Sequence, residues 1–194
     1  MKLNNSPIFA LLIISLFSCI KKVENFKEGD IIFQTSRSRQ SPLVALATLS
    51  NKTHCGIIVE KNNKLYVLEA SSKVCLTPID KFIAKGENGT YQVKRYTNKP
   101  MKIKYDKYLG QKYDLAFQFD NGKMYCSELV YIIYKDQFNI ELCKPRPIKS
   151  YHVRWSKKVQ SAMRNRGISL RQEAVAPSDL WNSKYLFPIK LTQK

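Results

Sequence analysis

The sequence predicts an α+β fold, in which helices pack on a mostly antiparallel sheet. Two observations support this prediction. Short runs rich in β-branched residues lie in the first half of the chain, two of them joined by Asn62 and Asn63, and a longer apolar run with helical spacing begins at Cys126. With 194 residues and 44% hydrophobic content, the chain can bury one substantial core, and we expect a single domain.

The first half of the chain supplies most of the expected sheet. We predict a strand over residues 30–34 and then a short helix over 42–49, rich in Leu, Val and Ala. Strands are predicted over 53–59 and 65–70, because both runs are β-branched or aromatic and a pair of asparagines separates them. A further strand is expected over 90–96.

Helices dominate the second half. The turn signal Asn-Gly at 121–122 precedes the helix that begins at Cys126, and glycines at 110 and 167 end two other helical segments. The helices expected after the predicted hairpin cover residues 78–85, 101–109, 126–138 and 155–166, and a last helical turn begins at Pro177.

The hairpin places His54 and Glu69 on one face of the sheet. If Asn62 and Asn63 are the two loop residues, Lys61 faces Lys64 and Gly56 lies opposite Glu69. His54 and Glu69 are then diagonal neighbours, and diagonal Cβ atoms lie about 7–8 Å apart, within reach of an imidazole–carboxylate hydrogen bond. A three-residue loop would place them on opposite faces, so the register tests this expectation.

Cys126 begins the predicted helix at 126–138, and this is a favourable position for a nucleophilic cysteine. Free backbone N–H groups and the positive end of the helix dipole favour the thiolate and can later bind an oxyanion. We therefore predict Cys126 as the nucleophile, His54 as the base and Glu69 as the group that orients the imidazole. Tyr125 and Gln34 are candidates for a further oxyanion donor, without support from spacing.

Several motifs together resemble the permuted papain-like amidases of the YiiX/YaeF type, in the NlpC/P60 superfamily. They are Gly29-Asp30-Ile31-Ile32-Phe33, Thr53-His54-Cys55-Gly56-Ile57, Leu68-Glu69-Ala70, Gly110-Gln111-Lys112-Tyr113-Asp114, Tyr125-Cys126-Ser127-Glu128-Leu129-Val130 and the late Ala176-Pro177-Ser178-Asp179-Leu180. Histidine precedes cysteine here, the reverse of ordinary NlpC/P60 peptidases, as circular permutation would give. The resemblance implies a permuted papain-like fold and a Cys126, His54, Glu69 triad that cleaves a peptide or N-acyl amide through a thioester.

The N-terminus resembles a bacterial lipoprotein signal peptide. An apolar run over residues 8–17 is too short to span a bilayer and ends in Leu16-Phe17-Ser18-Cys19, similar to a lipobox. We expect a signal peptide over 1–19 with Cys19 lipidated, a short tether over 20–26 and the permuted domain over 27–192. Such an enzyme would be anchored to a membrane of the cell envelope, outside the cytoplasm. Secretion after a nearby cut is the alternative.

No cofactor is expected. The chain has no Cys-x-x-Cys or paired-histidine spacing, which gives little support to a metal site. Five cysteines are present, and with Cys19 lipidated and Cys126 catalytic an odd three remain, so we do not expect a disulfide framework. Cys55 alternates to the strand face opposite His54 and is expected to point away from the site.

The chain is strongly basic, with 33 Lys and Arg against 15 Asp and Glu and a net charge of +18. Residues 144–172 contain nine basic side chains and no acidic one. For an exported lipoprotein, anionic lipid or a cell-wall polymer is the expected partner of such charge, and we do not expect nucleic acid. A solvated basic face without a partner explains the same pattern.

Three other functions are compatible with the sequence. The histidine-first order is also similar to the lecithin:retinol acyltransferase-like group, which would make the substrate a lipid ester. That group typically has Asn-Cys-Glu-His where this chain has Tyr125-Cys126-Ser127-Glu128, which favours the amidase. The remaining alternatives are a binding lipoprotein with an inactive site and a polyanion-binding surface protein without catalysis.

Overall fold

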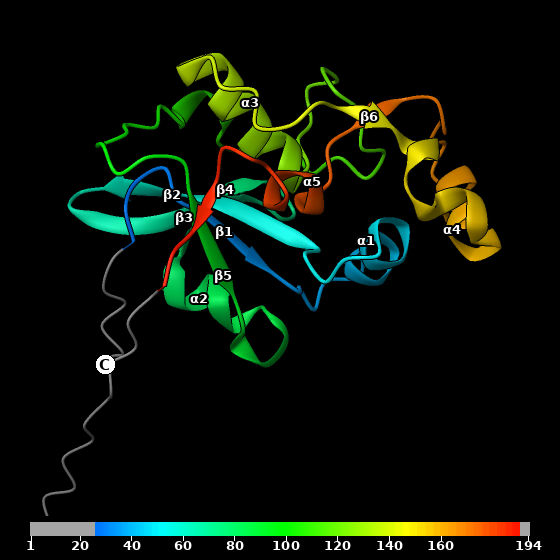
Figure 1. Cartoon of the computed structure of the whole chain (residues 1–194), viewed down its shortest axis with the longest axis horizontal. Helices are drawn as coiled ribbons and strands as arrows, with labels where there is room; N and C mark the ends of the chain where they lie inside the picture. Colours follow the sequence, from blue (N-terminus) through cyan, green and yellow to red (C-terminus); the bar gives the residue numbers. More distant parts are fainter. Residues whose placement is uncertain (1–25, 191–194) are drawn as a thin grey trace, which may run out of the picture.

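A six-stranded antiparallel sheet forms the centre of the computed structural model, which describes residues 26–190 (Figure 1). The strand order is β4-β3-β2-β1-β5-β8. The six strands are β1 (Ile31–Gln34), β2 (His54–Lys61), β3 (Lys64–Ala70), β4 (Val74–Pro78), β5 (Gln92–Arg95) and β8 (Phe187–Pro188). This sheet, together with its separate helices, confirms the predicted α+β class.

Two helices cover opposite faces of the sheet (Figure 1). On one face, α3 (Cys126–Phe138) packs Leu129 and Ile133 against Phe33 and Ile57 of the strands. On the other face lies α2 (Ile79–Ala84), whose Phe82 contacts the alternate strand residues, such as Ile32 and Ile58. Because successive strand residues point to opposite faces, neighbouring residues of β1 and β2 belong to different cores.

A third apolar cluster lies at one end of the sheet, where α1 (Ser41–Thr48) meets α4 (Lys157–Arg164). The small pair β6 (Arg146–Pro147) and β7 (Glu173–Ala174) leads from this cluster to α5 (Pro177–Trp181). Short 3₁₀ turns complete the structure: η1 (Glu87–Gly89), η2 (Asp106–Tyr108), η3 (Ile148–Ser150) and η4 (His152–Trp155). The predicted helices at 42–49, 78–85, 126–138 and 155–166 are confirmed, with ends that differ by at most two residues.

Arg146 and Arg166, both among the basic residues of 144–172, have structural roles. Arg146 forms an ion pair of 2.9 Å with Asp179 and stacks 3.8 Å from the ring centre of Tyr151. Arg166 donates a hydrogen bond of 2.6 Å to the side chain of Gln40, which connects the α4 end to the start of α1. Several of the remaining basic side chains, including Lys157 and Arg171, are exposed to solvent.

The β2–β3 hairpin has the predicted register. Lys61 pairs with Lys64 and Ile57 pairs with Leu68, as a two-residue loop requires. Asn62 and Asn63 both have positive φ, 51° and 58°, the conformation that two-residue hairpin turns need and that asparagine tolerates. The loop thereby fixes which hairpin residues share a face.

The predicted helix at 101–109 is wrong, and the structure has only the turn η2 (Asp106–Tyr108) there. The backbone N–H of Ile103 donates to Glu28 Oε1 at 2.8 Å, and that of Lys104 donates to Gln137 Oε1 at 2.8 Å. These backbone N–H groups therefore donate to distant side chains and not to carbonyl groups within a helix. Strand β4 is a further difference, because the sequence predicts no strand before the helix at 78–85.

Several sequence predictions lie outside the described residues. They are the signal peptide over 1–19 with Cys19, nearly all of the tether over 20–26, and the last two residues of the domain predicted over 27–192. Within 26–190, no helix has both the length and the apolar character needed to cross a bilayer.

Candidate active site

Cys126 is the first residue of α3, as predicted, and only 5% of it is exposed. The helix begins there because Tyr125 has extended backbone angles and its N–H donates to Glu128 Oε2 at 3.2 Å, as in a capping box. Burial raises the pKa of Glu128 to about 8, so this carboxyl adds little negative charge beside Cys126 at neutral pH. The first backbone N–H groups of α3 have no partner within the helix, and the helix dipole adds positive potential at this end.

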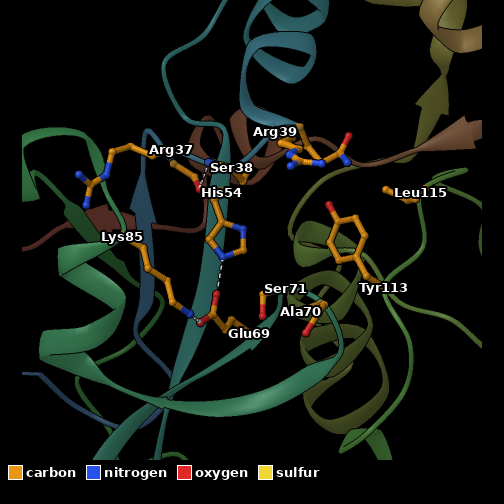
Figure 2. A pocket seen from close by; sticks show the side chains of 13 residues that line it. Arg37, Ser38, Arg39, His54, Glu69, Ala70, Ser71, Lys85, Tyr113 and Leu115 are labelled. Carbon is orange, nitrogen blue, oxygen red and sulfur yellow. Dashed lines mark hydrogen bonds and ion pairs between the residues drawn. The ribbon is translucent and has the colours of Figure 1, made fainter.

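The hairpin brings His54 and Glu69 into direct contact, as the register predicts. His54 Nε2 lies 2.6 Å from Glu69 Oε2 (Figure 2). The close approach of β2 and β3 here requires a glycine at Gly56, because a Cβ atom there would lie 2.4 Å from Val67 Cγ1 and 2.8 Å from the Leu68 carbonyl oxygen. Since Nε2 faces the carboxylate, Nδ1 is the ring nitrogen that remains for Cys126.

Glu69 is completely buried and fully hydrogen-bonded. Its Oε1 accepts from the Thr77 hydroxyl at 2.6 Å and from Lys85 Nζ at 2.7 Å. Burial opposes ionisation, but the contacts with His54, Lys85 and Thr77 lower the pKa of Glu69 to about 2. The carboxylate is therefore charged at any physiological pH.

His54 is held between a carboxylate and a thiol. Its ring stacks on Phe82, with centroids 5.4 Å apart and planes at 24°. Burial alone would lower the pKa of His54, but hydrogen bonds to Cys126 and Glu69 raise it to about 10. The imidazole therefore favours its charged form, as a thiolate–imidazolium pair requires.

Cys55 was expected to point away from the site, and this prediction is wrong. Its side chain does lie on the strand face opposite His54, but that face is the one on which α3 packs, so its thiol contacts Cys126. A hydrogen bond from the Cys55 thiol, helped by His54 and the Cys55 backbone N–H, holds the pKa of the Cys126 thiol well below its usual range despite burial. Burial raises the pKa of Cys55, which therefore remains a donor.

Replacing Cys55 by alanine should raise the pKa of Cys126, because the thiolate loses a donor. The rate of Cys126 alkylation by iodoacetamide at pH 6 should fall about fivefold, the effect of one net hydrogen bond. The rate is measured by peptide mass mapping between pH 4 and 9. Cys55→Ser should recover most of it, because a hydroxyl also donates, and Cys143→Ala is the control. An unchanged pH profile in Cys55→Ala would show that the Cys55 thiol does not support the thiolate.

Two hollows meet at this site. The first, which we call the polar hollow, has a volume of about 720 Å³ and is lined by His54, Glu69 and the side chains around them (Figure 2). The second, the apolar cleft, is narrow, with about 60 Å³, and Cys126 lies in its wall. Its other walls are mostly hydrophobic and come from α1, η3, η4, α4, the loop before α3 and the segment before α5. They include Val44, Ala47, Phe117, Ile148, Met163 and Val175.

Tyr113 lines both hollows and was not predicted as a site residue. Figure 2 shows its hydroxyl directed toward the space beside His54. Burial and the negative charge on Cys126 raise the pKa of Tyr113, so its hydroxyl remains a donor. The only sequence signal was its place in the Gly110–Asp114 motif of the resemblance.

The two residues named as further oxyanion donors lie in different surroundings. Gln34 lines neither hollow but a separate one, with Phe33 and Thr35. Tyr125 does line the apolar cleft, and its hydroxyl accepts a hydrogen bond of 3.1 Å from the Val175 N–H. Neither contact gives these residues a defined role at the sulfur.

Within residues 26–190, no three His, Cys, Asp or Glu side chains lie close enough together to bind a metal ion. The chain is similar to known proteins in both sequence and fold. The sequence matches the family described as "permuted papain-like amidase enzyme, YaeF/YiiX, C92 family" over residues 25–189. It is 34% identical over 168 residues to the uncharacterized protein YiiX of Escherichia coli strain K12, covering 81% of this chain and 83% of that one.

The fold is also similar to a crystal structure of YiiX from Escherichia coli O157:H7, described there as a metalloprotein. The TM-score is 0.77 at 31% sequence identity, and the match covers 87% of this chain and 98% of that chain. The permuted papain-like fold that the sequence resemblance implies is thus confirmed.

Proposed function

From the premise that this chain belongs to the permuted papain-like amidase family, a family of cysteine hydrolases, we propose that it cleaves a peptide or N-acyl amide bond with Cys126, His54 and Glu69. The observation that carries this proposal is the position of one imidazole. His54 is hydrogen-bonded to the carboxylate of Glu69, and the Cys126 thiol at the start of α3 is close enough to raise the pKa of the imidazole. This arrangement supports the assignment of Cys126 as nucleophile, His54 as base and Glu69 as orienting group.

The proposed reaction has two steps. The Cys126 thiolate attacks the carbonyl carbon, the amide bond breaks, and the imidazolium of His54 gives its proton to the departing amine. Water then loses a proton to His54 and attacks the thioester, which releases the acid and restores the thiol. Backbone N–H groups at the start of α3 and the Tyr113 hydroxyl are the donors available to the oxyanion. No step uses a metal ion.

A lipid ester is the second candidate substrate, and the apolar cleft favours it. Cys126 lies in a wall of that cleft, where an acyl chain bound to the sulfur would contact mostly apolar side chains. An acyl group from a phospholipid could therefore be transferred through the same thioester. We prefer an amide as the substrate because the family is one of amidases.

We further propose that the enzyme works at the cell envelope, anchored through a lipidated Cys19. The lipobox-like Leu16-Phe17-Ser18-Cys19 supports this proposal. The net charge of +18 would add attraction to anionic lipid or a cell-wall polymer. The substrate would then meet the enzyme at a membrane surface.

The test is a covalent acyl adduct on Cys126. The purified protein is mixed with peptidoglycan peptides, N-acyl amides and phospholipids, quenched in acid within milliseconds to seconds, and measured by intact mass and by product release. We expect a mass increase equal to the acyl group, located on Cys126, and release of an amine. An adduct from phospholipid alone would support the lipid candidate instead. Absence of both adduct and product across the panel would contradict the proposal.

A further inference from the structure

We propose that the polar hollow binds an anionic group of the substrate, a carboxylate or a phosphate, on the leaving-group side of the scissile bond. The cationic side chains that would bind it are Arg39, Arg37 and Lys85. This inference rests on the proposed function, because it uses the direction in which Cys126 and His54 would cleave the bond.

The two reacting side chains lie in different hollows. Cys126 is in the wall of the apolar cleft, whereas His54 is in the wall of the polar hollow, and Tyr113 borders both. In acyl transfer, the acyl group becomes bonded to the sulfur, and the leaving group receives its proton from the imidazole. The acyl side of the substrate therefore belongs in the apolar cleft, and the leaving group in the polar hollow.

The polar hollow has an excess of positive charge. Arg37, Arg39 and Lys85 line it beside the His54 imidazole, against Glu69 as the single acidic residue in its lining. Both oxygens of Glu69 are already occupied, Oε2 by His54 and Oε1 by Thr77 and Lys85. The excess charge of the arginines is therefore not neutralised inside the hollow, which favours an anion there.

Arg39 is the side chain with the most freedom to bind such an anion. It is exposed, and within the described part of the chain it has no ion-pair or hydrogen-bond partner. Arg37 donates to the Ala84 carbonyl, and Lys85 contacts Glu69. Figure 2 shows Arg39 on the opposite side of His54 from Lys85 and Glu69. A leaving group beside His54 would thus have cations on two sides, and a guanidinium can bind a carboxylate or phosphate through two hydrogen bonds.

The size and lining of the polar hollow fit a small polar group. Its volume of about 720 Å³ is within the range of ligand sites, and serines supply neutral donors around it. The leaving group that matches is an amine or alcohol that carries a carboxylate or a phosphate.

Matched substrates with the same acyl chain test this inference. N-Hexanoylglycine is compared with N-hexanoylglycinamide, and N-hexanoyl-aminoethyl phosphate with N-hexanoyl-aminoethanol. We expect kcat/KM to be about tenfold higher for the anionic member of at least one pair, and the pair that responds identifies carboxylate or phosphate. Arg39→Gln should remove most of the preference, Arg37→Gln part of it, and Arg39→Lys should keep more than Arg39→Gln.

Lys81→Gln is the matched control, because it removes one exposed positive charge from α2 without touching the polar hollow. Equal rates within each pair would overturn the inference, and so would a preference that Arg39→Gln leaves unchanged or that Lys81→Gln removes equally. Binding to Cys126→Ala, measured by calorimetry with the same four compounds, separates the two proposals. Preferential binding of the anions without any cleavage by the wild type would keep the anion site and reject the amidase. Cleavage without a preference for the anionic compounds, in either the kinetics or the calorimetry, would support the amidase and reject the anion site.

Discussion

Replacing Cys126 by alanine should abolish hydrolysis while the fold is kept. Loss of the nucleophile removes the thioester route, and the rate should fall by at least about 10⁴-fold, to the background of the assay. The change deletes only one sulfur atom at the first turn of α3, so the free energy of unfolding should change by about 1 kcal/mol. Product release is measured on the best substrate of the panel, and circular dichroism with thermal unfolding checks the fold.

Cys143→Ala is the matched control for this prediction. Cys143 is half-buried and lies outside both hollows, so its loss should leave turnover within about twofold of the wild type. His54 offers an internal check, because its pKa should fall in Cys126→Ala when the thiolate beside it is gone. Turnover by Cys126→Ala at a tenth of the wild-type rate or more would reject the cysteine as nucleophile.

The hairpin register was predictable because its causes are local. Two asparagines accept the positive φ of a tight turn, and the strand period of two residues then fixes every pair beyond it. The contact between His54 and Glu69 follows from that register alone. The place of Cys126 at a helix start was likewise visible, because the apolar spacing of the helix begins there.

Contacts between distant segments were not predictable in the same way. Strand alternation correctly placed Cys55 on the face opposite His54, but nothing in the sequence said that α3 packs on that face with its first residue reaching both side chains. The helix predicted over 101–109 is wrong for a related reason. Glu28 and Gln137 lie outside this segment and accept hydrogen bonds from its backbone N–H groups. Tyr113 reaches the site through a bridge to Met124, a pairing without a local signal.

The apolar cleft and the polar hollow also depend on the tertiary fold. The cleft forms only when α1 and α4 pack beside the start of α3, and the arginines of the polar hollow lie in the connection between β1 and α1. High basic charge in the sequence suggested a surface for anionic partners. The structure places Arg37 and Arg39 in the lining of the hollow that also contains His54, which is the basis of the proposed anion site.

Replacing Glu69 by glutamine should reduce turnover by about 10²–10³-fold while Cys126 remains in place. The amide nitrogen of glutamine can donate to His54 Nε2, which favours the tautomer with its proton on Nδ1. Since Nδ1 is the nitrogen that faces Cys126, the imidazole would then lack the lone pair that accepts the thiol proton. Loss of the carboxylate also lowers the pKa of His54, so the fall of activity at alkaline pH should begin at a lower pH than in the wild type.

The same substitution changes how stability depends on pH. The pKa of Glu69 is lowered from 4.5 to about 2 in the folded protein, so its ionised form contributes stability that is fully present above pH 4.5 and is lost as the pH falls toward 2. Glu69→Gln should therefore cost about 1–3 kcal/mol at pH 7 and little near pH 2, as measured by urea unfolding at both pH values.

Glu60→Gln separates the catalytic effect of Glu69 from a general loss of charge. Glu60 lies in the same hairpin but is exposed and outside both hollows, so its neutralisation should leave turnover, its pH profile and the acid stability unchanged. If Glu69 had only a structural role, Glu69→Gln would reduce stability. The activity per folded molecule, and the pH at which it falls on the alkaline side, would then be the same as in the wild type. If Glu69→Gln behaves so, the carboxylate supports the hairpin and does not orient the base.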